Sequence, residues 1–100
     1  MIKRIVRMSF YPEKVDDFLN WFNTHQEHIR NFEGCMHLEL WRDADYPNIF
    51  YTFSIWENAE SIEKYRQSEI FNKVWNYTKT LFNDKPMAFS AIEQIINQKI

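Results

Sequence analysis

The sequence MHLELWRDADYPNIFYTFSIW, residues 36–56, predicts a β-hairpin. Side chains alternate in character along both of its arms, about 36–42 and 49–56, as they do in strands. Between the arms, residues 43–48 form a polar turn that contains Pro47. We therefore expect two antiparallel strands in this part of the chain.

On the N-terminal side of the hairpin, residues 2–10 alternate in the same way and predict another strand. Pro12 then opens a helix, because its fixed φ suits the first helical turn. The helix extends to about Arg30, and Gly34 is free to adopt the left-handed conformation after it. Its apolar stripe consists of Val15, Phe18, Leu19, Phe22 and Ile29.

On the C-terminal side, a short helix carries Ile62 and Tyr65, and Ser68 with Glu69 marks the start of a second helix. A last strand follows Pro86, over about 87–95. The element order is therefore βαββαβ, which predicts an α+β fold of the ferredoxin-like type, with a four-stranded antiparallel sheet and helices on one face.

The alternation also divides the side chains between the two faces of this sheet. We expect the more apolar set to face the helices: Val6, Met8, Leu38, Leu40, Tyr51, Phe53 and Phe89. The opposite set mixes polar and aromatic side chains: Arg7, Ser9, His37, Glu39, Trp41, Thr52, Ser54, Trp56 and Ser90. A face of this composition suits contact with a second subunit, so we expect a homodimer through the sheet faces.

Length and composition exclude several classes of protein. A chain of 100 residues predicts a single domain over 1–100, and the aromatic content of 18% excludes disorder. The net charge of −2 gives no case for nucleic acid, and no apolar stretch is long enough to span a membrane. With no signal-peptide pattern, we expect a cytoplasmic protein.

The single glycine excludes phosphate- and dinucleotide-binding loops, and Cys35 alone cannot form an internal disulfide or a multi-cysteine zinc site.

From Pro12 onward the chain resembles the antibiotic biosynthesis monooxygenase (ABM) family. The resemblance rests on an ordered set of short motifs: Phe32-Glu33-Gly34-Cys35, Leu38-Glu39-Leu40-Trp41-Arg42-Asp43, Pro47, Phe53-Ser54-Ile55-Trp56-Glu57, Tyr65-Arg66, Ser68-Glu69, Phe71, Lys85-Pro86 and Ser90. It implies a dimeric α/β barrel. It also implies a monooxygenase that oxidises a quinol or another small aromatic substrate with O2, without metal or flavin.

Other members of the family degrade haem with an Asn, a Trp and a His. The corresponding positions fall near Val6, at Tyr65 and at Trp75, and none of these residue types is kept, which disfavours haem degradation. In many quinol-oxidising relatives a His takes the place of Tyr65. We therefore expect no cofactor, and Tyr65 is the first candidate for a catalytic residue because its hydroxyl could orient a phenolic substrate or take its proton.

A flat aromatic ligand would need side chains on which to stack. The candidate substrate-binding residues are Tyr51, Phe53, Trp56, Phe71 and Trp75, although aromatic residues at such spacings are more often plain core. His25 is the second catalytic candidate, since it borders the apolar stripe of the first helix. His25 and His28 lack a third ligand nearby in sequence, so we expect no metal site.

Two further readings stay open. The chain could be a non-enzymatic homodimer that binds a small hydrophobic molecule, or it could catalyse proton transfer of the muconolactone-isomerase type on the same barrel. The charged residues Arg7, His37 and Glu39 are expected to pair across strands or across the dimer.

Overall fold

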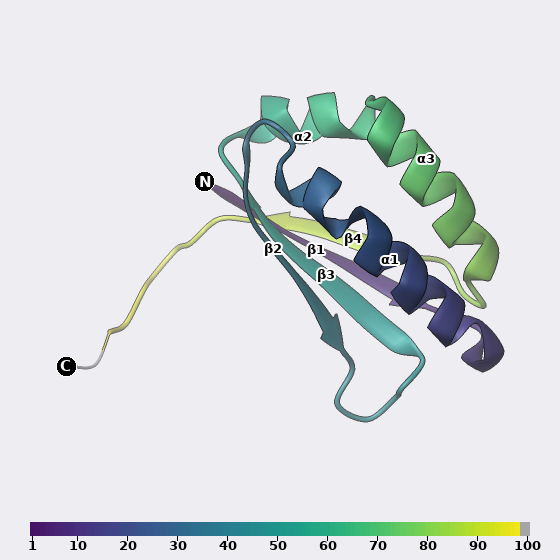
Figure 1. Ribbon diagram of the computed structural model, residues 1–100. Coiled ribbons are helices and arrows are strands. Elements are labelled where there is room, and N and C mark those ends of the chain that lie inside the picture. Colours follow the sequence, from purple (N-terminus) through teal and green to yellow (C-terminus); the bar gives the residue numbers. More distant parts are fainter. Residues whose placement is uncertain (99–100) are drawn as a thin grey trace.

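A computed structural model describes residues 1–98. Four strands form one antiparallel sheet in the order β2-β3-β1-β4: β1 Ile2–Ser9, β2 Cys35–Arg42, β3 Ile49–Trp56 and β4 Met87–Ala91. The helices lie together on one face of this sheet (Figure 1). They are α1 Val15–Arg30, α2 Ala59–Arg66 and α3 Glu69–Thr78, with short 3₁₀ turns η1 Pro12–Lys14 and η2 Lys79–Leu81. The predicted ferredoxin-like fold is confirmed.

The helix boundaries follow the local signals in the sequence. Pro12 stands at the first position of η1, which leads directly into α1. Asn58 and Ser68 cap α2 and α3, since their side-chain oxygens accept hydrogen bonds from the backbone N–H groups of Ser61 and Phe71. The predicted break at Ser68 is thereby confirmed.

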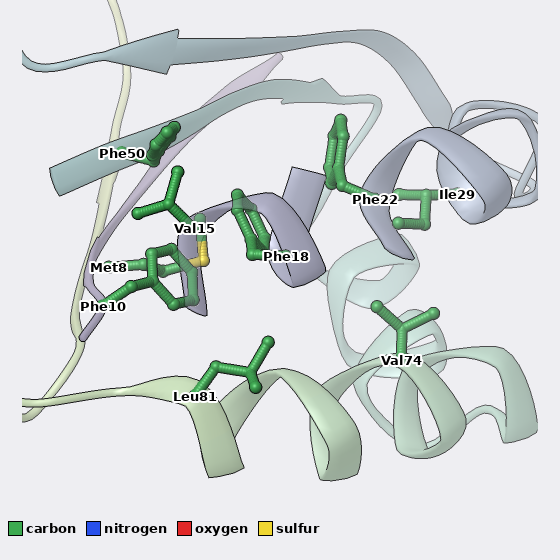
Figure 2. Close-up of a cluster of buried hydrophobic side chains, with 9 residues drawn as sticks. All are labelled: Met8, Phe10, Val15, Phe18, Phe22, Ile29, Phe50, Val74 and Leu81. Atoms are coloured by element: carbon green, nitrogen blue, oxygen red, sulfur yellow. The ribbon is translucent and has the colours of Figure 1, made fainter. Parts of the chain in front are cut away.

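The main core lies between α1, the sheet and α3 (Figure 2). The ring of Phe10 stacks on that of Phe18, with 4.2 Å between centroids, and both contact Phe50 edge-on. The nine buried residues of this cluster are Met8, Phe10, Val15, Phe18, Phe22, Ile29, Phe50, Val74 and Leu81. A smaller cluster of Cys35, Trp56 and Ile62 lies between α2 and the sheet.

The face assignment of β3 from sequence is wrong. Residues paired across antiparallel strands share a face, and Val6 pairs with Thr52 while Met8 pairs with Phe50. The helix-facing residues of β3 are therefore Phe50, Thr52, Ser54 and Trp56. Tyr51 and Phe53 lie on the opposite face, which we call the open face because no helix covers it. Both sides of β3 carry large aromatic residues, so its alternation alone does not identify the buried side.

The last strand differs from its prediction in two respects. It ends at Ala91 rather than near residue 95, and after it the chain extends away from the body of the domain (Figure 1). Phe89 pairs with Ile5, and Val6 pairs with Ala88, so Phe89 lies on the open face and Ala88 and Ser90 face the helices. The small side chains on the inner side of β4 leave space beneath the helices.

The start of β2 is irregular. The register shifts between Cys35 and His37, where a bulge interrupts the pairing with β3. As a result Cys35 is buried, as predicted, whereas Met36 is 46% exposed instead of facing the helices. Leu38 and Leu40 lie on the helix-facing side as predicted, since they pair with Ser54 and Thr52.

Candidate functional site

A cavity of about 310 Å³ lies between the sheet and the helices. This volume is within the range that binds small organic ligands. Residues of both core clusters contribute to its wall, so the cavity occupies the space between them. The sheet contributes Arg4, Val6, Met8, Leu38, Thr52, Ser54, Trp56 and Ala88. The helices and the segment before β4 contribute Phe18, Phe22, Ile29, Tyr65, Arg66, Phe71, Val74, Trp75, Thr78 and Pro86.

Four aromatic side chains form a continuous wall along this cavity. The rings of Trp56 and Tyr65 are 5.1 Å apart, and those of Tyr65 and Phe71 are 5.2 Å apart. Phe71 and Trp75 are nearly parallel, at 14° and 5.9 Å, because they stand one helical turn apart on α3. The indole N–H of Trp56 donates to Ser54 Oγ at 2.9 Å, which fixes its ring in the floor of the cavity.

Tyr65 is the titratable aromatic residue of this wall. Burial, and to a smaller extent the neighbouring Cys35 thiol, raise the pKa of its hydroxyl far above the ordinary value, while Arg4 acts in the opposite direction. Among residues 1–98 no hydrogen bond satisfies the hydroxyl. At neutral pH, Tyr65 is therefore a neutral phenol that can donate a hydrogen bond to a molecule in the cavity but is a poor base.

The polar part of the cavity contains two arginines that the sequence reasoning did not single out as site residues. Arg4 lies on β1 two residues before Val6 and therefore on the same, helix-facing side of the strand. Its Nη1 donates to Ser90 Oγ at 3.2 Å. Burial lowers the pKa of Arg4, and the positive charge of Arg66 at the end of α2 lowers it further. The alternation of β1 was the signal that could have identified Arg4, since it places a guanidinium among inward-facing apolar residues.

Comparison with known proteins adds the family. A sequence model described as "Antibiotic biosynthesis monooxygenase" matches residues 1–75, three quarters of the chain. The chain belongs to the ABM family. The matched part extends from β1 to Trp75 of α3 and so includes the whole aromatic wall of the cavity.

Solved structures share the fold of this chain. A conserved protein from Methanosarcina mazei Go1 superposes with a TM-score of 0.88 at 18% identity, over 93% of this chain and 92% of its own. Two proteins that carry the ABM name come from Nitrosomonas europaea (TM-score 0.86, 14% identity, 95% and 100% coverage) and Deinococcus radiodurans (0.83, 19%, 99% and 100%). At these identities the likeness shows the fold alone. Comparison with curated proteins gives no significant match.

Of the site residues predicted from sequence, Tyr65, Trp56, Phe71 and Trp75 meet at the cavity of this ABM domain. Tyr51 and Phe53 do not, because they lie on the open face of the sheet. There Phe53 stacks on Trp41 at 5.0 Å and 13°, and the hydroxyl of Tyr51 donates to Asp43 Oδ1 at 2.6 Å. Their predicted place in the cavity wall is therefore wrong.

His25 also lies outside the cavity of the ABM domain. It is 5% exposed, its ring lies 4.0 Å from that of Trp21, and its Nδ1 is 2.9 Å from the Trp21 carbonyl oxygen. Because a carbonyl only accepts, Nδ1 carries the hydrogen, and the histidine is satisfied within α1.

Among residues 1–98 no three His, Cys, Asp or Glu side chains come close enough together to hold a metal ion.

The charged residues of the open face pair locally. His37 Nε2 contacts Glu39 Oε2, and the indole N–H of Trp41 donates to Glu39 Oε1 at 2.8 Å. The hydrogen bond from Trp41, followed by that from His37, lowers the pKa of Glu39. His37, Glu39 and Trp41 all belong to β2, so these contacts run along one strand. Arg7 of β1 lies opposite Tyr51 of β3, and the expected pairing across the dimer stays a prediction. Within the described part of the chain, no helix has the length and apolarity to cross a membrane.

Proposed function

We propose that this ABM protein is a cofactor-independent monooxygenase that oxidises a quinol or another small aromatic molecule with O2. The observation that carries the proposal is the cavity of about 310 Å³, walled by Trp56, Phe71 and Trp75 and supplied with the hydroxyl of Tyr65. Flat rings stack favourably on such a wall. Buried polar groups among apolar ones orient a ligand that would otherwise bind in many positions.

The chemistry requires the substrate to be held as an anion, since an electron-rich phenolate can pass electrons to O2 without a cofactor. The positive charge of Arg4 favours this anion, and the neutral hydroxyl of Tyr65 donates a hydrogen bond to it or to the peroxide that follows. A C–O bond forms between the ring and O2, and loss of water then breaks the O–O bond. For a hydroquinone the balance is one quinol and one O2 giving one hydroxyquinone and one water.

Haem does not fit this cavity. The lining residues within the described chain include no imidazole or thiolate. The one phenol among them, Tyr65, has a raised pKa and stays protonated, and the one thioether, that of Met8, is buried in the core. Proteins hold haem iron chiefly through such imidazole, thiolate or phenolate groups. We therefore disfavour haem degradation for this chain.

Oxygen uptake with a panel of hydroquinones tests the proposed activity. We expect protein-dependent uptake that a chelator leaves unchanged and that falls by about 10²-fold in kcat in Tyr65→Phe, the usual loss when a proton-donating group is removed. Tyr77→Phe is the matched control, because Tyr77 lies on α3 but does not line the cavity. Full activity of Tyr65→Phe would remove the catalytic role of Tyr65, and uptake no faster than in buffer with every quinol would refute the monooxygenase.

One observation favours a second candidate, a module that binds a small hydrophobic molecule without turning it over. The described lining residues include no Asp, Glu or His, so the cavity offers no ordinary base. Retention of an aromatic ligand through purification, together with no oxygen uptake with any quinol, supports this binding role over the enzyme.

We further propose that the protein is a homodimer in which a second copy covers the open face of the sheet. That face presents large apolar side chains to solvent: Trp41 is 39% exposed, Met87 48% and Phe89 52%. Beyond it, Ile92, Ile95 and Ile96 are each more than 60% exposed. So many exposed large apolar side chains on one face of a sheet are typical of a surface that another protein chain covers.

A further inference from the structure

Two guanidinium groups border the cavity with little negative charge beside them. Arg4 comes from β1 and Arg66 from the last turn of α2, and both line the cavity. Among residues 1–98 the side-chain hydrogen bond of Arg4 is to the neutral Ser90 hydroxyl. Arg66 Nη1 lies 4.0 Å from Glu63 Oε2, and more than half of each side chain is exposed, so this pair neutralises little charge.

Both arginines line the same cavity, and the positive charge of Arg66 contributes to the lowered pKa of Arg4. Like charges brought together at the edge of an apolar cavity raise the local positive potential, because the low-dielectric wall screens it poorly. Tyr65, which precedes Arg66 on α2, lines the same cavity. A bound anion would relieve the repulsion, and Arg4, Arg66 and Tyr65 line this cavity with hydrogen-bond donors.

The aromatic lining residues favour a ligand whose remaining part is flat and apolar. Trp56, Phe71 and Trp75 provide flat surfaces, and the described lining has no carboxylate that would repel an anion. We propose that Arg4, assisted by Arg66, forms an anion subsite, and that the substrate of this cavity is a flat aromatic anion whose carboxylate or phenolate oxygen binds Arg4. This inference deepens the proposed function, because it takes the same cavity as the site of the reaction and names the class of its substrate.

Binding of a matched ligand pair tests the subsite without any turnover. The probes are 2-naphthoate and its neutral isostere 2-naphthamide, titrated by calorimetry into the full chain at low salt. We expect naphthoate to bind about tenfold more tightly than naphthamide, the effect of one charge-assisted contact. Equal affinities of the two probes in the unaltered protein would overturn the subsite.

Three variants assign the preference to its residues. In Arg4→Gln the preference for naphthoate should be lost, and in Arg66→Gln it should fall about threefold because Arg66 is the more exposed charge. Lys3→Gln is the matched control: it removes one positive charge from the neighbouring position of β1, but Lys3 pairs with Glu93 and does not line the cavity. Loss of the preference in Lys3→Gln, or its persistence in both Arg4→Gln and Arg66→Gln, would contradict the assignment.

The outcomes separate this inference from the proposed function. If naphthoate binds through Arg4 while no quinol is oxidised, the anion subsite stands and the monooxygenase fails. If a quinol is oxidised while naphthoate and naphthamide bind with equal affinity, the oxygenase activity stands and the anion subsite fails. Arg4→Gln replaces a half-buried side chain, so its circular dichroism is recorded first. If Arg4→Gln does not fold, Arg66→Gln and the salt dependence of naphthoate binding test the anion subsite instead. We expect the affinity for naphthoate to fall about fivefold between about 20 mM and about 0.5 M NaCl.

Discussion

Two tyrosines of this protein have raised pKa values for different physical reasons. For Tyr65 the main cause is burial, whereas for Tyr51 it is the hydrogen bond that its hydroxyl donates to Asp43 on the exposed side of the sheet. Burial acts whatever partners are present, because it penalises the charged phenolate itself. The protonation of the Tyr65 hydroxyl is therefore linked to the free energy of unfolding.

This link predicts a loss of stability in alkaline solution. Below a pH of about 10 Tyr65 is protonated in both the folded and the unfolded chain, so it causes no pH dependence there. Above that pH the unfolded chain releases the proton while the folded chain keeps it, and the free energy of unfolding falls as the pH rises. Urea unfolding between about pH 9 and 11 should show a smaller decline in Tyr65→Phe than in the unaltered protein, and an equal decline in both would contradict the burial of this hydroxyl.

The surroundings of His25 could not be predicted from the sequence. Its spacing from Phe22 and Ile29 places it at the edge of the apolar stripe, and sequence alone treated it as a border residue with catalytic potential. The structure buries it, because Trp21 covers its ring and supplies a carbonyl acceptor for its Nδ1. The carbonyl acceptor stands one turn earlier on α1 itself, but the position of the Trp21 ring depends on the packing of α1 against α3, where its indole N–H donates to the Val74 carbonyl. Periodicity does not carry that information.

At the scale of elements, the turn between α1 and β2 is held tightly against α2. Gly34 has a φ of +88°, and a Cβ at this position would lie 2.2 Å from Ser61 Oγ. The backbone N–H of Glu57 donates to the Gly34 carbonyl at 2.8 Å, which joins the end of β3 to the same turn. Glycine is required here for its conformation and for space.

Substitution of this glycine tests the junction. Gly34→Ala should lower the free energy of unfolding by about 2–4 kcal/mol, from left-handed strain plus the overlap with Ser61. In the double variant with Ser61→Gly the overlap is removed but the strain remains, so the double variant should lose less stability than the two single variants added together. Strictly additive losses in urea unfolding would show that the contact with Ser61 does not matter.

The elements themselves were predictable, and their faces only in part. Pro12, Gly34 and Ser68 marked the ends of helices and the alternation marked the strands, because these signals act over a few residues. The inward side of β3 depends on its pairing with β1, and Tyr51 and Phe53 were as apolar as the residues that are buried. The bulge after Cys35 and the orientation of β4, which places Phe89 on the open face, likewise depend on pairing between strands that are distant in sequence. Of the five predicted substrate-binding residues, three therefore line the cavity: Trp56, Phe71 and Trp75.

At the scale of the whole molecule, the helices cover one face of the sheet and leave the open face without a cover (Figure 1). The proposed homodimer predicts a mass in light scattering of twice the 12.4 kDa of the chain at micromolar concentration. Phe89→Glu places a charge on that face and should shift the mass toward one chain. Tyr11→Glu, at an exposed aromatic residue outside the sheet, should not. A mass near that of one chain for the unaltered protein would refute the dimer.

The four tryptophans stand in four different surroundings. Trp41 lies on the open face, Trp56 in the floor of the cavity, Trp75 in its wall, and Trp21 between two helices. Each is a natural fluorophore, so the protein carries optical reporters for separate parts of its structure. In the single chain a dissolved quencher should reach Trp41 first, and association through the open face should shield it, whereas an occupant of the cavity should alter the emission of Trp56 and Trp75. Single-tryptophan variants can therefore follow association and ligand entry as separate signals, without any added dye.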